Sequence, residues 1–411
     1  MNRTETGGSP AASEGPGSLG DPIDRRRFLI LMGGAAALAA AGPRAAFAKK
    51  DANGKPPPIP AELPSSQVET ARALIAAAIL APSDWNTQPW SFEVDGASIR
   101  LVADAQRTLP VTDPERRGMM IALGAALENL LVAARAYGLR PTVAYFPHAG
   151  VNGVVAEVTW SEGETQRDLG MSAAIPERRT NRREYDGRAI LPQARAQLTA
   201  QIPEGLFLHW IDERDPMREV ADLAHDATRE QILNPRAQGE QFAWMRFDDE
   251  AQKRRDGVPV DALELGGPSG WFAGRTYNPK SRFLHFGAEG AGKQARSQVR
   301  SAGALALLCG PRREESQWLM GGQAFERFAL KATQLGLAHQ ALSAPVESER
   351  HRGDLLSMFG AAGEDPLVLM RLGRAKPPQG DPPAHRRGGL ELPEHVGRVA
   401  SPRAPPALGL R

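Results

Sequence analysis

The 411-residue sequence has a single cysteine and only eight histidines. One cysteine excludes an intramolecular disulfide, and the histidines are scattered without the spacing of metal ligands, so no metal site is expected. The chain carries 50 basic and 48 acidic residues, a balance that gives no long-range field to attract nucleic acid or anionic lipid. Cys309 ends the apolar run that starts at Ala304, which predicts a buried strand residue.

Long hydrophobic stretches are also missing. The best candidate for a membrane-spanning segment, residues 28–41, is rich in glycine and alanine. As a helix it would span about 21 Å at about 1.5 Å per residue, short of the ~30 Å hydrocarbon core, although a membrane anchor stays the alternative. It follows Arg25-Arg26-Arg27-Phe28-Leu29 and precedes Ala46-Phe47-Ala48. This arrangement resembles a twin-arginine (Tat) signal peptide with a cleavage site after Ala48. The resemblance implies that the twin-arginine export machinery delivers the folded protein to the periplasm or cell envelope.

After the expected signal at residues 1–48, composition divides the chain into a linker at 49–65, a first half over 66–165, a second half over 166–395 and a flexible tail over 396–411. Within the second half, residues 248–298 are rich in glycine, proline and arginine and show no regular pattern. An interruption of that length usually forms a lid or a binding loop.

Periodicity predicts mixed helices and strands in both halves, an α+β chain. Two pairs of residues have the capping-box spacing that starts a helix, Ser66 with Glu69 and Thr112 with Glu115. The other helices are expected from residue 192, over 217–233 and over 315–335. Strands are expected over 90–94, 99–103, 142–146, 154–160, 206–211, 304–309 and 367–372, the first two joined by a turn at Asp95-Gly96.

An internal repeat emerges when the sequence is shifted by 198 positions against itself. The matches lie within one helix and its exit: Gly124 with Gly322, Ala126 with Ala324, Glu128 with Glu326, Ala134 with Ala332, Gly138 with Gly336, Leu139 with Leu337, and Pro147 with Pro345. The repeat predicts two fused modules with a site between them. Chance agreement of two alanine-rich helices is the alternative.

Four segments resemble the nitroreductase superfamily. Pro82-Ser83-Asp84-Trp85-Asn86 is similar to its Pro-Ser-x-x-Asn loop, and Arg178-Arg179-Thr180-Asn181-Arg182 to its phosphate motif. Gly336-Leu337-Ala338-His339 resembles the helix exit that passes the flavin ring, and Arg386-Arg387 the terminal basic pair. The exported, double-module arrangement is closest to the Acg-like branch. The resemblance implies the nitroreductase-like α+β fold, with two modules fused as a pseudo-dimer, and FMN as cofactor.

In ordinary members of this superfamily, one subunit supplies the phosphate arginines and the helix exit while its partner supplies the Pro-Ser-x-x-Asn loop. Here the second half has the former and the first half has the latter. Residues 62–70 contain no basic side chain, so the first half lacks its own phosphate motif. We therefore expect one complete site, one FMN per chain, and a monomer that mimics a dimer.

The expected site follows from the chemistry of a flavin phosphate, which guanidinium groups bind in bidentate pairs. The candidate cofactor-binding residues are Arg178, Arg179, Thr180, Arg182, Pro82, Ser83, Asn86, Gly336, Leu337, Arg386 and Arg387. A solvated basic face is the alternative for the arginines, and a turn role for Asn86. No catalytic side chain is required because the flavin carries the chemistry. His339 is the only candidate proton donor, with a structural role as its alternative.

The function implied is an FMN-dependent oxidoreductase of nitroreductase type. It would transfer two electrons as a hydride to a small planar acceptor such as a nitroaromatic or a quinone, with NAD(P)H as a candidate donor. Two other interpretations stay open. One is a non-catalytic protein that sequesters flavin under a lid formed by residues 248–298, and the other is a structural protein that has lost FMN.

Overall fold

In the computed structural model, the described residues are 63–147, 153–163, 167, 169–246, 254–259, 285–376 and 399–400. The expected export signal lies outside them. One described helix, α3 (Arg117–Ala136), is long and apolar enough to cross a membrane, but 94% of its most apolar window is buried inside the protein. Helix α3 is therefore a core helix of the first half.

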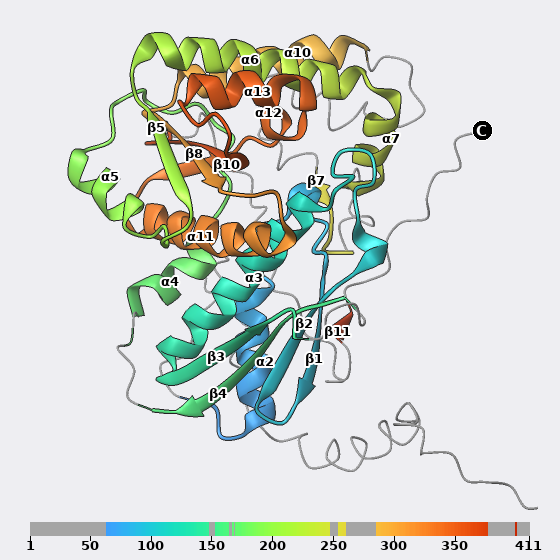
Figure 1. The fold of residues 1–411 in the computed structure, drawn as a ribbon, viewed down its shortest axis with the longest axis vertical. Coiled ribbons are helices and arrows are strands. Elements are labelled where there is room, and N and C mark those ends of the chain that lie inside the picture. Colours follow the sequence, from blue (N-terminus) through green and yellow to red (C-terminus); the bar gives the residue numbers. More distant parts are fainter. Residues whose placement is uncertain are drawn as a thin grey trace, which may run out of the picture. The chain divides into compact units, whose positions relative to one another are not determined.

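The first sheet is antiparallel throughout, with the strand order β11-β1-β2-β4-β3. Its strands are β1 (Trp90–Asp95), β2 (Ser98–Ala103), β3 (Leu139–Tyr145), β4 (Val154–Glu162) and β11 (Val399–Ala400). Gly96 has a φ of 57°, the left-handed conformation that a tight hairpin favours, so the predicted β1–β2 turn is confirmed. Helices α2 (Gln67–Ala78) and α3 lie along this sheet (Figure 1).

The second sheet is also antiparallel, in the order β5-β8-β10-β9, so that β5 and β9 are its edges. Its strands are β5 (Phe207–Ile211), β8 (Ala304–Gly310), β9 (Ala338–Ala341) and β10 (Asp365–Gly373). Strand β8 is buried along its whole length because both faces of the sheet are covered. Leu308 packs in the cluster that contains Phe328, whereas Leu307 packs in a second cluster with Val220.

The helices on the two faces of the second sheet explain this burial. Helix α11 (Glu315–Gln334) covers one face, and α6 (Arg214–Leu233), α10 (His285–Arg300), α12 (Ala344–Glu347) and α13 (Glu349–Met358) cover the other (Figure 1). The remaining elements are short: α4 (Leu169–Glu177), α5 (Pro192–Thr199), α7 (Pro235–Trp244), β6 (Met245–Arg246), β7 (Val258–Pro259), and the 3-10 turns η2 (Asp84–Asn86) and η3 (Ala105–Arg107).

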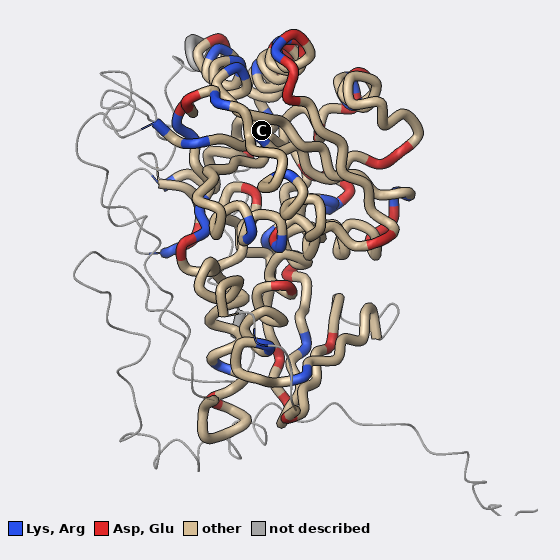
Figure 2. Tube along the Cα trace, turned by 90° about the vertical axis from the view of Figure 1, so that its left-hand side faces the viewer, with Lys and Arg blue, Asp and Glu red and all other residues tan. Residues whose placement is uncertain are grey.

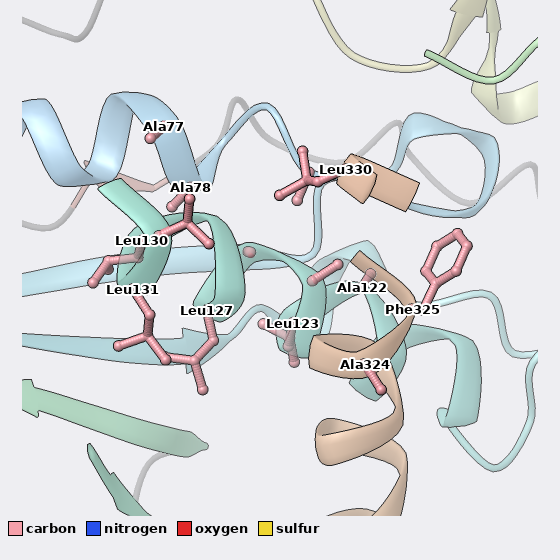
Figure 3. Packing of buried hydrophobic residues seen from close by; sticks show 14 of the residues in the cluster. Ala77, Ala78, Ala122, Leu123, Leu127, Leu130, Leu131, Ala324, Phe325 and Leu330 are labelled. Carbon is pink, nitrogen blue, oxygen red and sulfur yellow. The ribbon is translucent and has the colours of Figure 1, made fainter. Parts of the chain in front are cut away.

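Helices α3 and α11 cross with backbone against backbone at Gly124 and Gly322. A Cβ added at either glycine would lie 2.9 Å from the Cα of the other. The added Cβ of Gly124 would also overlap the carbonyl oxygen of Leu319, and that of Gly322 would overlap the carbonyl oxygen of Ile121. These contacts are reciprocal under the same shift of 198 positions. Apolar side chains pack around the crossing, and Leu123 of α3 and Ala324 of α11 belong to the same buried cluster (Figure 3).

Ser66 is confirmed as the N-cap in the first predicted capping box, although the Glu69 carboxylate accepts from Ser65 Oγ at 2.8 Å, and the second predicted capping box is wrong. Ser66 Oγ accepts a hydrogen bond from the backbone N–H of Glu69 at 3.3 Å. At the start of α3, the carboxylate of Asp113 instead accepts from the N–H groups of Gly118 (3.1 Å) and Met119 (2.9 Å). The hydroxyl of Thr112 donates to Glu240 at 2.6 Å. A carboxylate one residue further along therefore satisfies the free donors of the helix.

One further expectation needs correction. Residues 248–298 are not irregular throughout, because α10 occupies their end and packs in the same layer as α6 (Figure 1). Within the tail expected to be flexible, β11 pairs with β1, where Ser91 lies opposite Ala400. Charges of both signs are interspersed along the described chain (Figure 2).

Candidate functional site

The predicted Pro-Ser-x-x-Asn segment forms a tight loop after α2. Ser83 Oγ accepts a hydrogen bond from the N–H of Gln88 at 3.0 Å, which closes the loop. Trp85, Asn86 and Gln88 have φ values of 50°, 52° and 51°. Left-handed conformations are uncommon for residues with a Cβ and cluster at functional sites. The loop is thus held in a conformation that its own sequence does not favour.

A second segment, residues 254–259, holds this loop in place. Asn86 Nδ2 donates to the carbonyl oxygen of Gly257 at 2.9 Å, and the N–H of Gly257 donates back to the carbonyl of Asn86 at 3.0 Å. Gln88 Nε2 donates to the carbonyl of Arg255 at 2.8 Å. The Asn86 N–H₂ group, expected to face a flavin ring or its own loop, is therefore engaged with residues far away in the sequence.

A buried charge cluster anchors the 254–259 segment from beneath. Asp256 is 2% exposed and accepts from Arg246 Nε at 3.1 Å and from Arg107 Nη2 at 3.3 Å. Arg107 also donates to the carbonyl of Thr87 at 2.6 Å. Burial lowers the pKa of Arg107, and the nearby Asp256 opposes that shift. The carboxylate thus compensates two buried guanidinium groups and ties both segments together.

Arg178, the first residue of the predicted phosphate motif, joins the two halves. Its side chain is 1% exposed, and its Nε lies 3.1 Å from Glu326 Oε1 on α11. Its Nη2 donates to the carbonyl of Leu80, just before the Pro82 loop, at 3.3 Å. Because Glu326 neutralises this guanidinium, Arg178 offers a bound phosphate less charge than the sequence suggested.

The phosphate motif runs beside the predicted helix exit. Gly336 ends α11 with a φ of 68°, and the N–H of Leu337 then donates to the carbonyl of Ala332 at 2.9 Å. Thr180 forms a parallel bridge with His339, and the N–H of Asn181 donates to the His339 carbonyl at 3.0 Å. The fold therefore brings these two predicted site segments together.

The remaining residues of the motif differ in exposure. Arg179 is exposed, while Thr180 and Arg182 are half-buried. The backbone carbonyl of Arg182 accepts from Gln298 Nε2 at 2.7 Å, so α10 fixes this part of the chain. Arg386 and Arg387 lie outside the described residues.

Sequence reasoning missed Arg371, a fully buried arginine in the middle of β10. Its Nη2 donates to the backbone carbonyls of Asn181 (2.9 Å) and Arg183 (2.8 Å), and its Nε donates to Gln340 at 2.7 Å. Arg371 thus sets the path of the phosphate motif. A single arginine within the apolar run of residues 367–372 was the available signal.

His339 does not suit the proton-donating role considered for it. Its side chain is 3% exposed, and burial, reinforced by Arg178, lowers its pKa to about 3. The ring is therefore neutral at physiological pH and can donate only an ordinary N–H. Its Nε2 and the Arg178 Nη1 are buried and have no hydrogen-bond partner among the described residues.

An acidic cluster lies on the other side of the loop and was also missed. Burial raises the pKa of Asp84 to about 6, and the nearby Asp113 adds to the shift. Burial raises the pKa of Glu347 in α12 to about 8, with Asp84 as the next cause. Gln231 Nε2 donates to Glu347 at 2.7 Å. Asp84 of the first half and Glu347 of the second are therefore close enough to interact, and Arg117 opposes the rise in the pKa of both.

The chain is similar in sequence to known proteins. The Mycobacterium tuberculosis protein named "Putative NAD(P)H nitroreductase Rv3131" is 30% identical over 335 residues, which cover 78% of this chain and 89% of that protein. The chain belongs to the nitroreductase superfamily. A second M. tuberculosis protein, "Putative NAD(P)H nitroreductase acg", is 26% identical over 346 residues, covering 81% of this chain and 98% of that protein. No profile of a known protein family matches the chain.

Solved structures give a looser comparison. A nitroreductase from Anabaena variabilis superposes with a TM-score of 0.41 at 12% identity, covering 72% of this chain and 82% of its own. The FMN-dependent nitroreductase NfnB from Mycobacterium smegmatis, in complex with NADPH, gives 0.31 at 15% identity, covering 50% and 88%. Superpositions this loose carry no argument. Membership of the superfamily rests on the sequence relatives, and the observed α+β architecture agrees with the predicted fold class.

Proposed function

We propose that this protein is an FMN-dependent oxidoreductase that passes two electrons to a small planar acceptor, such as a nitroaromatic or a quinone. One observation supports the proposal: the phosphate motif runs beside the helix exit of the second half, and its Arg178 donates to the carbonyl of Leu80, just before the Pro82 loop of the first half. Relatives named as NAD(P)H nitroreductases support a nicotinamide donor.

The residues present fit a cofactor with polar ring atoms and a phosphate. Arg178 Nη1 and His339 Nε2 are buried polar atoms without a partner among the described residues, a condition that a bound polar group would relieve. Arg182, Arg179 and Thr180 would hold the phosphate, because Glu326 already compensates Arg178. When bound, FMN supplies the hydride chemistry.

The protein's own titratable side chains would determine which groups near the Pro82 loop carry a proton. A pKa of about 8 means that Glu347 keeps its proton at neutral pH, whereas Asp84, at about 6, is mostly ionised. His339 stays neutral and can only orient a ligand by hydrogen bonding. Glu347 is therefore the group at this site that can hold a transferable proton.

We further propose that the chain is a pseudo-dimer with one FMN and no need for a second copy. The reciprocal contacts of Gly124 with Leu319 and of Gly322 with Ile121 support a two-fold relation between α3 and α11. Flavin absorbance and molecular mass of the purified protein would test this. Two FMN per chain, or a dimer that shares its site, would overturn it.

Arg182→Ala tests the flavin site directly. Removing a charge partner of a bound phosphate costs about 2–5 kcal/mol, which is about 30-fold to several thousand-fold in affinity. The variant should purify folded but largely colourless. The matched control Arg218→Ala removes an exposed arginine from α6 that pairs with Asp215, and it should keep its flavin. Full FMN affinity in Arg182→Ala would place the phosphate elsewhere.

A second candidate function is flavin storage without turnover. The observation that favours it is the set of hydrogen bonds that hold residues 254–257 against the Pro82 loop and Arg107, through Asn86, Gln88 and Asp256. Steady-state NADPH oxidation on addition of a nitroaromatic or a quinone separates the two functions. Catalysis requires turnover, storage predicts flavin without it, and a freshly purified protein without a flavin absorbance band would exclude both.

Export by the twin-arginine pathway is also our proposal, supported by the Arg25-Arg26-Arg27-Phe28-Leu29 sequence. Arg25→Lys combined with Arg26→Lys should leave unprocessed precursor in the cytoplasm. Cell fractionation with an antibody against the mature protein measures this outcome. Normal processing of the double variant would contradict the assignment.

A further inference from the structure

Three potential metal ligands meet on the second sheet, at the edge away from β9. His209 lies on β5, Cys309 on β8, and Glu364 directly before β10. One ligand atom from each residue lies within 4.8 Å of the other two. His209 Nε2 and Glu364 Oε2 are 2.8 Å apart. The three residues are far apart in the sequence, and strand pairing alone brings them together.

The register of the sheet explains this meeting. Phe207 pairs with Cys309 and His209 with Leu307, so His209 and Cys309 lie diagonally on one face of neighbouring strands. On the other side of β8, Pro366 pairs with Cys309, so Glu364, two residues before Pro366, lies diagonally from Cys309 on the same face. Two of the three candidate ligands are thus fixed by strands, which hold side chains more precisely than loops do.

We propose that His209, Cys309 and Glu364 bind a divalent transition metal ion, with Zn²⁺ the best match. One thiolate, one imidazole and one carboxylate are the ligand types that Zn²⁺ accepts, and three protein ligands leave a fourth position for water. The His209 and Glu364 side chains are 24% and 22% exposed, so solvent reaches that side of the cluster. Cys309 closes it from within the core.

Binding must displace a proton. Burial, with Glu364 as the next cause, raises the pKa of the Cys309 thiol, so the thiol is protonated without metal. The ion would replace the thiol proton, which is released to solvent. It would also displace the proton in the hydrogen bond between His209 Nε2 and Glu364, which is taken up at Nδ1 of the same ring or released to solvent, so that the Nε2 lone pair binds the metal. Affinity should therefore fall as the pH is lowered.

The cluster is separate from the proposed flavin site. His209 lies on one edge strand of the sheet, whereas His339 lies on the opposite edge strand. Loss of metal should consequently leave flavin content unchanged. Flavin content thus distinguishes failure of this proposal from failure of the proposed function.

Co²⁺ titration of the full chain, after treatment with a chelator, is the test. We expect one equivalent of Co²⁺ to give a thiolate-to-cobalt charge-transfer band and tetrahedral d–d bands, both removed by added Zn²⁺. Cys309→Ser should lose the charge-transfer band. Glu364→Gln, a change at a half-exposed position that should not impair folding, should weaken binding by more than the ~100-fold typical of changes outside the ligand shell.

His225→Gln is the matched control. His225 also lies near two carboxylates, Asp226 at 2.7 Å and Glu289 at 3.6 Å, but the cluster has no thiol. This variant should bind Co²⁺ like the unaltered protein. The proposal is wrong if the unaltered protein shows no charge-transfer band, if folded Cys309→Ser keeps it, or if Glu364→Gln binds Co²⁺ with unchanged affinity.

Discussion

Glu128 of α3 and Glu326 of α11 occupy equivalent positions 198 residues apart, and both are fully buried where the two helices pack. Glu128 receives two hydrogen bonds from Arg327, at 2.7 and 3.0 Å. Glu326 lies 3.1 Å from Arg178, which comes from outside the helix pair. The same carboxylate position therefore pairs within the helices on one side and with the phosphate motif on the other.

The partners of the two glutamates differ in charge and in exposure. The position equivalent to Arg327 is Asn129 on α3, which has no charge to offer Glu326. Arg178 supplies that charge and also contacts Leu80 of the first half. Arg327 remains 30% exposed, whereas Arg178 is 1% exposed. A nearly symmetric helix crossing thus acts as scaffold on the Glu128 side and positions the phosphate motif on the Glu326 side.

Disrupting the crossing of α3 and α11, which both sides share, should have the largest effect on stability. Gly124→Leu inserts a side chain where α3 and α11 touch through their backbones. Overpacking that backbone cannot relax should cost about 5 kcal/mol or more, in the exceptional range for single substitutions. Urea unfolding, or recovery of soluble protein, measures the outcome.

Gly353→Leu is the matched control, because Gly353 lies in α13 with open space around its Cα. It should change the free energy of unfolding by no more than about 1 kcal/mol, since leucine favours helices more than glycine does. Equal stability of the two variants would show that the crossing is not tightly packed.

The next test substitutes each of the two buried glutamates, Glu128 and Glu326, on its own. Glu326→Gln leaves Arg178 buried without its carboxylate and should cost about 3–5 kcal/mol. Glu128→Gln should cost less, about 1–3 kcal/mol, because Arg327 can turn toward solvent. Urea midpoints of the two variants give the comparison directly. Equal losses would mean that the two sides are energetically equivalent and that our distinction is wrong.

The pH dependence of the free energy of unfolding tests the environment of the carboxyl groups of Asp84 and Glu347. Glu347 and Asp84 have pKa values raised to about 8 and about 6 in the folded protein, so folding favours their protonated forms. Their stabilising contribution is complete below about pH 4 and is lost as the pH rises through 6 and then 8. Glu347→Gln should therefore lose less stability than the unaltered protein between pH 5 and pH 8.

Urea unfolding at several pH values would measure that difference, with the exposed Glu349→Gln as control. The control should follow the unaltered protein at every pH. Parallel curves for Glu347→Gln and the unaltered protein would show that the carboxyl groups do not share a buried environment.

The smallest effect is expected at the exposed ends of the helix pair. Glu115 and Arg313 occupy equivalent positions under the 198-residue shift. The Arg313 guanidinium donates to the Glu115 carboxylate, and this hydrogen bond lowers the pKa of that carboxyl. Both side chains are more than a third exposed, so Arg313→Ala should cost less than about 1 kcal/mol. A double-mutant cycle with Glu115→Ala, at low and high salt, would reveal any larger coupling.

Much of the fold could be predicted because local chemistry is sufficient for it. Apolar runs predicted seven strands of the two sheets, β1 to β5, β8 and β10, and Ser66 with Glu69 predicted the start of α2. The short strands β9 and β11 were not predicted. The start of α3 was misplaced because Asp113 and Thr112 both offer oxygen atoms, and only the loop path decides which one reaches the free N–H groups. Helix α10 was missed because its glycines concealed the helical pattern.

The sequence by itself determined which segments are candidates for the site, since the motifs at Pro82, Arg178 and Gly336 are local strings of residues. Only the tertiary structure decided what those side chains contact. Burial against Glu326 compensates the charge of Arg178, burial makes His339 neutral, and the clasp by Gly257 engages Asn86. The meeting of His209, Cys309 and Glu364 had no local signature either. Ion pairing, desolvation and strand register depend on residues distant in the chain, and no local pattern encodes those distances.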